Sequence, residues 1–183
     1  MIDKVGDKGV HSAPATNRGE KGELMDQVEP TMAAETPVTS VPKSLYVVGF
    51  LGLLWNGFGA YDYIMTRMRN TDYLASAMPG VDPNAVLAWI DGFPLYAQIG
   101  WGLGVWLGLL GSVLLLMRNR WAVWSYALSL VGAVLGLGYQ IALAPPLAGA
   151  EGPMYEIMPY VIILVAAFLL WYAWSMEKKG VLR

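Results

Sequence analysis

The chain has 183 residues, of which 14% are charged and 56% are hydrophobic, and its formal net charge is −2. A water-soluble domain carries about 25% charged residues, so this composition argues against an ordinary soluble domain and indicates a membrane protein. The near-neutral charge balance argues against a nucleic-acid partner, which would require a basic surface. The absence of cysteine excludes disulfides and thiolate metal sites, and the single histidine, His11, precedes the apolar part of the chain. We therefore expect no metal and no cofactor.

The segment from Met1 to Lys43 is rich in Gly, Pro, Ser, Thr, Glu and Lys and has no periodic apolar pattern. Such a segment cannot bury enough apolar surface to offset the entropy lost on ordering it. We predict a disordered cytoplasmic tail over residues 1–43 and a transmembrane domain over residues 44–183.

Four apolar runs follow, each long enough to cross about 30 Å of hydrocarbon as a helix. They cover residues 44–66, 95–117, 121–143 and 157–176. Helices satisfy every backbone group inside lipid, and the runs show no alternation typical of a barrel. The predicted fold class is therefore all-α, an up-and-down bundle of four transmembrane helices.

The segment between the first two runs, residues 67–93, contains signals for two short interfacial helices. Asn70 or Thr71 can cap one helix, and Asp82 followed by Pro83 is typical of the start of another. The second helix would have an apolar side made of Val86, Leu87, Trp89 and Ile90. We expect it to lie at the membrane surface or to fold over the mouth of the bundle.

Basic residues are distributed unequally between the two ends of the predicted bundle. One end has Arg67 and Arg69, and the other has six basic residues: Lys43, Arg118, Arg120, Lys178, Lys179 and Arg183. Basic residues are retained on the cytoplasmic side of membrane proteins, so we predict that both termini are cytoplasmic.

Small residues recur at helical spacing in the second and third runs. The second run carries Gly100, Gly104 and Gly108, and the third carries Ser129, Gly132 and Gly136. Residues four apart share a helix face, and a face without side chains allows close approach of another backbone. We predict that these two helices pack together within one chain. A homodimer interface and a cofactor groove are the alternatives.

Polar side chains within the runs are the candidate functional positions. Asn56 lies near mid-membrane, and we expect its amide to bond to Gln140 or to a serine of the third run; a substrate contact is the alternative. Asp62 lies just inside the membrane boundary, where a carboxylate is costly unless it is paired or hydrated. We expect it to pair with Arg69 or Arg67, with an ion site or exposure to water as alternatives.

Three stretches resemble a small family of uncharacterised bacterial inner-membrane proteins, some of which are labelled sugar transporters. They are LWNGFGAYDYIMTRMRN from Leu54, AWIDGFP from Ala88 and GWGLGVWLGLLGSVLLLMR from Gly100. The resemblance implies a four-helix protein of the bacterial inner membrane and no catalytic residue.

The function that these features favour is non-catalytic, an accessory or structural subunit of a membrane complex. The alternative is a small-solute, sugar-like transporter or channel, acting as a dimer in one version, with a polar cavity lined by Asn56, Asp62, Gln98, Gln140 and tyrosines. A membrane enzyme is a third and weaker hypothesis, since no catalytic motif is present. The expected partners are the lipid bilayer and either other membrane subunits or further copies of the chain.

Overall fold

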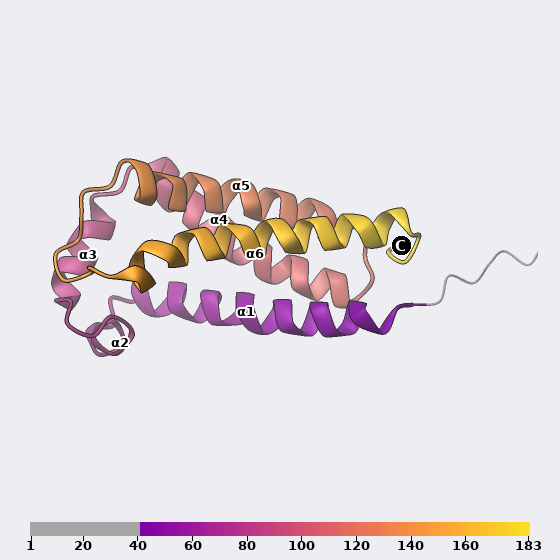
Figure 1. Cartoon of the computed structure of the whole chain (residues 1–183), viewed down its shortest axis with the longest axis horizontal. Helices are drawn as coiled ribbons and strands as arrows, with labels where there is room; N and C mark the ends of the chain where they lie inside the picture. The colour runs from indigo at the N-terminus through magenta and orange to yellow at the C-terminus, as the bar shows by residue number, and fades with distance from the viewer. Residues whose placement is uncertain (1–40) are drawn as a thin grey trace, which may run out of the picture. The chain divides into compact units, whose positions relative to one another are not determined.

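The computed structural model describes residues 41–183, and these residues form six helices and no strand. The helices are α1 Lys43–Arg67, α2 Thr71–Ala77, α3 Pro83–Asp91, α4 Leu95–Leu116, α5 Trp121–Ala142 and α6 Pro153–Lys178 (Figure 1). The predicted disordered tail, apart from its last three residues, lies outside the described residues.

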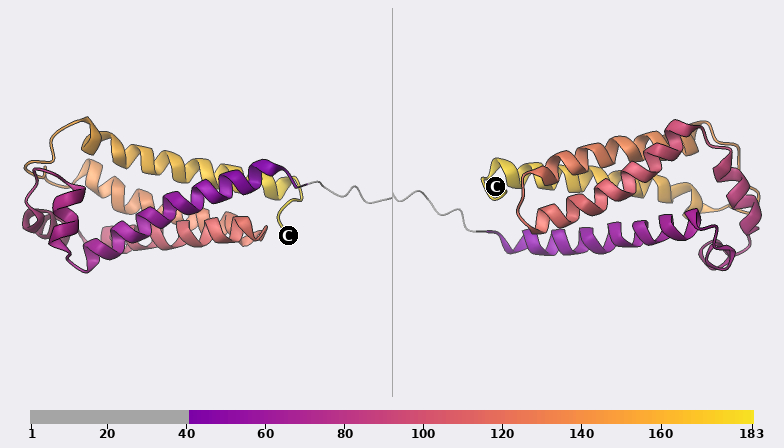
Figure 2. Two further views of the ribbon diagram at one scale, coloured as in Figure 1. Left: turned by 90° about the horizontal axis from the view of Figure 1, so that it is seen from below. Right: turned by 180° about the vertical axis from the view of Figure 1, so that it is seen from behind.

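Four of these helices, α1, α4, α5 and α6, are long and apolar enough to cross a membrane. They run up and down, with α4 and α5 in the most extensive contact, α1 against α4 and α6 against α5 (Figures 1 and 2). The predicted all-α fold is confirmed. The one clear difference in length is that α6 begins at Pro153 rather than at residue 157, because proline fits the first turn of a helix, where no backbone donor is needed.

The end of the bundle where α1 begins is closed by a buried apolar cluster. Leu45, Leu115, Tyr126 and Val181 are its largest fully buried apolar side chains. After α6 the chain turns at Gly180, which has a φ of 67°, and its last residues return to the turn between α4 and α5. There Arg183 donates its N–H to the Arg118 carbonyl at 2.8 Å and accepts from the Arg120 N–H at 2.9 Å.

The opposite end carries α2 and α3, which share a second, smaller apolar cluster of Leu74, Val81, Val86 and Leu87. Asn70 and Asp82 cap the two helices by accepting from the backbone N–H groups of Tyr73 and Asn84. Trp89 of α3 donates its indole N–H to the Pro145 carbonyl at 2.7 Å, which ties this cap to the loop after α5.

The tripeptide Met-Arg-Asn ends both α1, at residues 68–70, and α4, at residues 117–119. In each copy the arginine has a positive φ, 56° at Arg69 and 59° at Arg118. The backbone N–H groups of the Arg and the Asn bond back to the last turn of the helix, the pattern that glycine usually forms at a helix C-terminus. In the first copy the Asn70 side chain caps α2, and in the second the Asn119 side chain accepts from the N–H of Trp121, the first residue of α5. One sequence motif therefore ends one helix and starts the next.

Candidate functional site

The small-residue stripes of α4 and α5 pack against each other within the chain. A methyl group built on Gly132 would lie 2.6 Å from the Gly100 carbonyl oxygen and 2.6 Å from the Gly104 nitrogen. On Gly136 it would lie 3.0 Å from the Trp101 nitrogen. Ser129 lies in the same seam and donates to the Gly104 carbonyl at 2.6 Å. The stripes are therefore covered by each other, so this seam is no open groove for a cofactor.

Asn56 belongs to a hydrogen-bonded group of three polar side chains, Asn56, Ser112 and Tyr126, which we name the interior network. The Asn56 Nδ2 donates to the Ser112 Oγ at 3.1 Å and to the Gly52 carbonyl at 2.9 Å. The Tyr126 hydroxyl also donates to the Ser112 Oγ at 3.0 Å, and Ser112 donates to the Gly108 carbonyl at 3.1 Å. A hydroxyl has one donor and two acceptor positions, so the Ser112 hydroxyl uses its whole bonding capacity inside the protein.

The prediction that Asn56 bonds to Gln140 or to a serine of the third transmembrane helix is wrong. Its partner is Ser112 of α4, the second transmembrane helix. Asn56 lies at the level of Gly108 and Ser129, where a methyl group on Gly108 would collide with the Asn56 amide oxygen. Gln140 is 11 residues further along α5, which is about 16 Å along a helix. It therefore lies too far towards the α2 and α3 end to reach Asn56.

Asp62 accepts a hydrogen bond from the Tyr73 hydroxyl at 2.8 Å, and the expected ion pair with Arg67 or Arg69 is wrong. Arg69 follows the end of α1 in a left-handed conformation, so the helical spacing that would have aligned it with Asp62 no longer holds. Desolvation, and then the hydrogen bond to the Asp62 carboxylate, raise the pKa of the Tyr73 hydroxyl above its ordinary value. The phenol therefore keeps its proton and remains a donor to Asp62.

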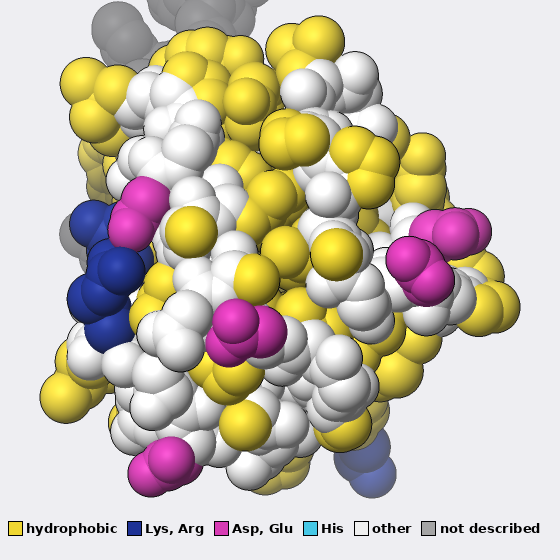
Figure 3. Space-filling view, turned by 90° about the vertical axis from the view of Figure 1, so that its left-hand side faces the viewer, with side chains coloured by type: hydrophobic (Ala, Val, Ile, Leu, Met, Phe, Trp, Pro, Cys, Tyr) yellow, Lys and Arg dark blue, Asp and Glu magenta, His cyan; other side chains and the backbone are white. Residues whose placement is uncertain are grey.

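Arg67 and Arg69 instead meet residues of α3 and α4 at a pocket of about 160 Å³, which we name the arginine pocket. It is lined by Thr66, Arg67, Arg69, Leu87, Ile90, Asp91 and Gln98. Figure 3 looks onto this end of the molecule and shows a compact group of basic side chains at one edge, with an acidic side chain beside it.

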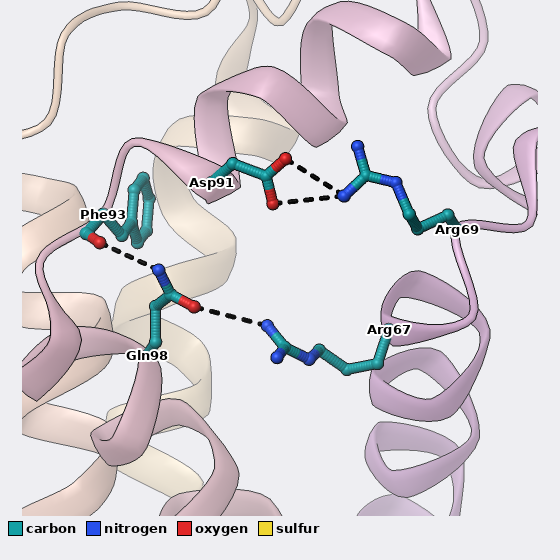
Figure 4. Close-up of polar contacts among 5 residues, drawn as sticks. All are labelled: Arg67, Arg69, Asp91, Phe93 and Gln98. Carbon is teal, nitrogen blue, oxygen red and sulfur yellow. Dashed lines mark hydrogen bonds and ion pairs between the residues drawn. The ribbon is translucent and has the colours of Figure 1, made fainter.

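Each arginine of the pocket is held by a different partner (Figure 4). One guanidinium nitrogen of Arg69 donates to both carboxylate oxygens of Asp91, at 3.2 and 3.0 Å, and both side chains are more than half exposed. Arg67 donates to the Gln98 Oε1 at 3.3 Å, and Gln98 in turn donates its Nε2 to the Phe93 carbonyl at 2.9 Å. The hydrogen bond to the Phe93 carbonyl thus fixes the orientation of the Gln98 amide, so that its oxygen faces Arg67.

The predicted positions therefore fall into three separate places: Asn56 in the interior network, Asp62 beside α2, and Arg67, Arg69 and Gln98 at the arginine pocket. Gln140 is half-buried on α5 and joins none of them. Sequence reasoning did not single out Ser112, Tyr73 or Asp91. The partner of Asp91 could have been predicted in kind, because an acid at the C-terminal end of a short helix is unfavourable unless a cation is close.

Within residues 41–183, no group of three or more His, Asp or Glu side chains is arranged to hold a metal ion. In the same residues every fully buried side-chain nitrogen and oxygen has a hydrogen-bond partner. Comparisons of the chain with protein-family models, with curated proteins and with solved structures found no match. The geometry and the sequence are therefore the basis for assigning a function.

Proposed function

We propose that this multi-pass membrane protein lies in the bacterial inner membrane with both termini in the cytoplasm. The support is the distribution of basic residues over a bundle in which α1 begins at the same end where α6 ends. That end carries six lysines and arginines of the helices and their turns, against two at the end with α2 and α3. The sense of this difference agrees with retention of basic residues on the cytoplasmic side.

We propose further that the protein is non-catalytic and serves as an accessory or structural subunit of a membrane complex. The interior network is the observation that carries this proposal. The polar groups of this network bond to one another and to backbone carbonyls, and Ser112 is completely buried. A solute path needs polar groups that are free to exchange partners with the solute or with water, and this network has used its donors.

The resemblance to the family of small bacterial inner-membrane proteins remains part of the proposal. Its three stretches supply the second half of α1 with its ending turn, the end of α3, and most of α4. These segments form the interior network, except Tyr126, and most of the arginine pocket. A protein of that family should therefore keep Asn56, Ser112, Arg69 and Asp91 as a set.

An accessory role is tested by the size of the native particle. Protein expressed at its natural level and extracted in mild detergent should migrate on a native gel well above its own mass of 20.0 kDa plus detergent. Overexpressed protein, in excess over its partner, should add a small species that the natural level lacks. A single small species at both expression levels would contradict the accessory role.

A small-solute transporter is the second candidate, and the arginine pocket is the observation that favours it. The pocket is polar, lies at one end of the bundle and contains three of the predicted positions, Arg67, Arg69 and Gln98. Purified protein in proteoliposomes that exchanged labelled sugar across the membrane would favour this candidate. Exchange should then fall when Gln98 is replaced by alanine.

A further inference from the structure

We propose that the arginine pocket is a binding site for a singly charged phosphate group, either the headgroup phosphate of a membrane lipid or free phosphate. An anion site at this end of the molecule is independent of the accessory role proposed above.

The charge of the pocket favours an anion. Among its lining residues Arg67 and Arg69 are basic and Asp91 is acidic, so one positive charge remains. The Arg69–Asp91 contact is the one ion pair formed within residues 41–183. Arg67 has only the neutral Gln98 amide as its side-chain partner there, and a ligand with one negative charge would balance it.

The remaining bonding capacity of the pocket consists mainly of donors. The Gln98 oxygen already accepts from Arg67 and its amide nitrogen already donates to Phe93, while both Asp91 oxygens accept from Arg69. A guanidinium has five N–H groups and no acceptor, so each arginine keeps N–H groups for a further partner. A lipid phosphodiester only accepts hydrogen bonds, and singly charged free phosphate accepts through its two unprotonated oxygens. Both suit these donors better than a neutral sugar hydroxyl, which offers one oxygen and no charge. Paired N–H groups of arginine match phosphate oxygens closely.

The two arginines are oriented before a ligand arrives. Gln98 is fixed by the Phe93 carbonyl and holds Arg67, while Asp91 of α3 holds Arg69 (Figure 4). Side chains fixed in this way lose less freedom on binding than free surface arginines do. The backbone of Arg69 adds to this order, because its left-handed φ of 56° directs the chain away from the axis of α1.

Size and depth agree with a phosphate group. A pocket of about 160 Å³ is comparable to a cavity of about 150 Å³ that holds benzene, a molecule of six heavy atoms. A phosphate group has five. Thr66 and Arg67 belong to the last turn of a membrane-spanning helix, which is the level of the lipid headgroups.

The test measures binding to the full-length protein in detergent, with two ligands in separate arms. One arm titrates inorganic phosphate at constant ionic strength, and the other titrates short-chain phosphatidylglycerol, with thermal stability as the readout in both. Wild type should show a saturable rise in melting temperature in at least one arm. Arg67→Gln should weaken that binding about tenfold, the effect of one lost hydrogen bond to a charged group. Arg67→Lys keeps the charge but loses the paired donors, so its affinity for the ligand should lie between those of wild type and Arg67→Gln.

Two further variants separate binding from damage to the fold. Arg120→Gln removes the same charge at the other end of the bundle and should bind as wild type does. Asp91→Asn removes the competing negative charge but keeps one side-chain oxygen to hold Arg69, so it should bind the ligand more tightly, a gain that unfolding cannot produce. A response to phosphatidylglycerol alone identifies a lipid site, and a response to phosphate alone identifies a soluble ligand. No saturable response in either arm, or an equal response in Arg67→Gln and wild type, would overturn the site.

Discussion

Arg69 and Arg118 each occupy a backbone position where glycine would be without strain. A residue with a side chain pays about 1–2 kcal/mol for the left-handed conformation. Each arginine has a contact that offsets part of this cost, since Arg69 bonds to Asp91 and the Arg118 Nε donates to the Val181 carbonyl at 3.3 Å. Both copies of Met-Arg-Asn thus connect the end of one helix to a segment distant in the chain.

Comparing two substitutions of Arg69 isolates the backbone strain. Arg69→Gly and Arg69→Ala both lose the Asp91 contact. The positive φ at position 69 is strained for alanine but not for glycine. We expect the glycine variant to be more stable than the alanine variant by about 1 kcal/mol, the reverse of the usual order inside a helix. Unfolding of both variants in a denaturing detergent measures the difference. An alanine variant as stable as the glycine variant would show that position 69 is not strained.

The Tyr73 hydroxyl makes the free energy of unfolding depend on pH in the alkaline range. Because its folded-state pKa is raised above 10.0, the folded protein binds this proton more tightly than the unfolded chain does. Its contribution is fully present below pH 10 and is lost as the pH rises through the higher, folded-state pKa. Tyr73→Phe should cost about 1–2 kcal/mol at neutral pH, because it removes a hydrogen bond to a carboxylate. The gap between wild type and the variant should then narrow above pH 10.

The control for this measurement is Tyr96→Phe, which removes a hydroxyl from an exposed tyrosine of α4. Its stability should follow that of wild type at every pH. A Tyr73→Phe variant that stays a constant amount below wild type from neutral to alkaline pH would contradict the pH dependence.

At the scale of helices, the glycine seam between α4 and α5 brings two helix backbones into close contact. A methyl group on Gly132 would press on the backbone of α4 at two atoms, and a backbone cannot move aside as a side chain can. A methyl group on Gly57 of α1 would meet nothing within 4 Å. The two glycines therefore form a matched pair for the same substitution.

We expect Gly132→Ala to destabilise the protein by about 1–3 kcal/mol, the usual cost of overpacking. Gly57→Ala should be neutral or slightly stabilising, because alanine has the better helix propensity. Thermal unfolding of both variants in one detergent provides the comparison. Equal melting temperatures for Gly132→Ala and Gly57→Ala would show that α4 and α5 are not in close contact.

Hydropathy and helix caps were sufficient to predict the helices, because both are local properties of the chain. The spans, the cap at Asp82 and the small-residue stripes could all be read from residues close in sequence. The side-chain partners could not. Asp62 was assigned to Arg69 on the assumption of a continuous helix, but one left-handed residue redirects Arg69 to Asp91, 22 positions further along the chain. Asn56 was assigned to the third span because sequence does not show which helices are neighbours.

At the scale of the whole molecule, the two ends of the bundle differ in how they are closed. Residues 180–183 and the turn between α4 and α5 close one end through backbone hydrogen bonds. The other end has the α2 and α3 cap and the polar arginine pocket. Between them, the interior network joins three side chains of α1, α4 and α5 without a free donor at Ser112. A molecule of this kind has a binding surface at one end and a closed interior.

Cysteine labelling tests the closed interior most directly, because the chain has no cysteine of its own. Ser112→Cys places a thiol of similar size in the interior network, and Ser76→Cys places one on the exposed side of α2. In right-side-out membrane vesicles, a water-soluble maleimide should modify position 76 quickly and leave position 112 unmodified until the protein is denatured. Modification of position 112 at a rate similar to that of position 76 would reveal a water-filled path through the bundle and contradict the accessory role.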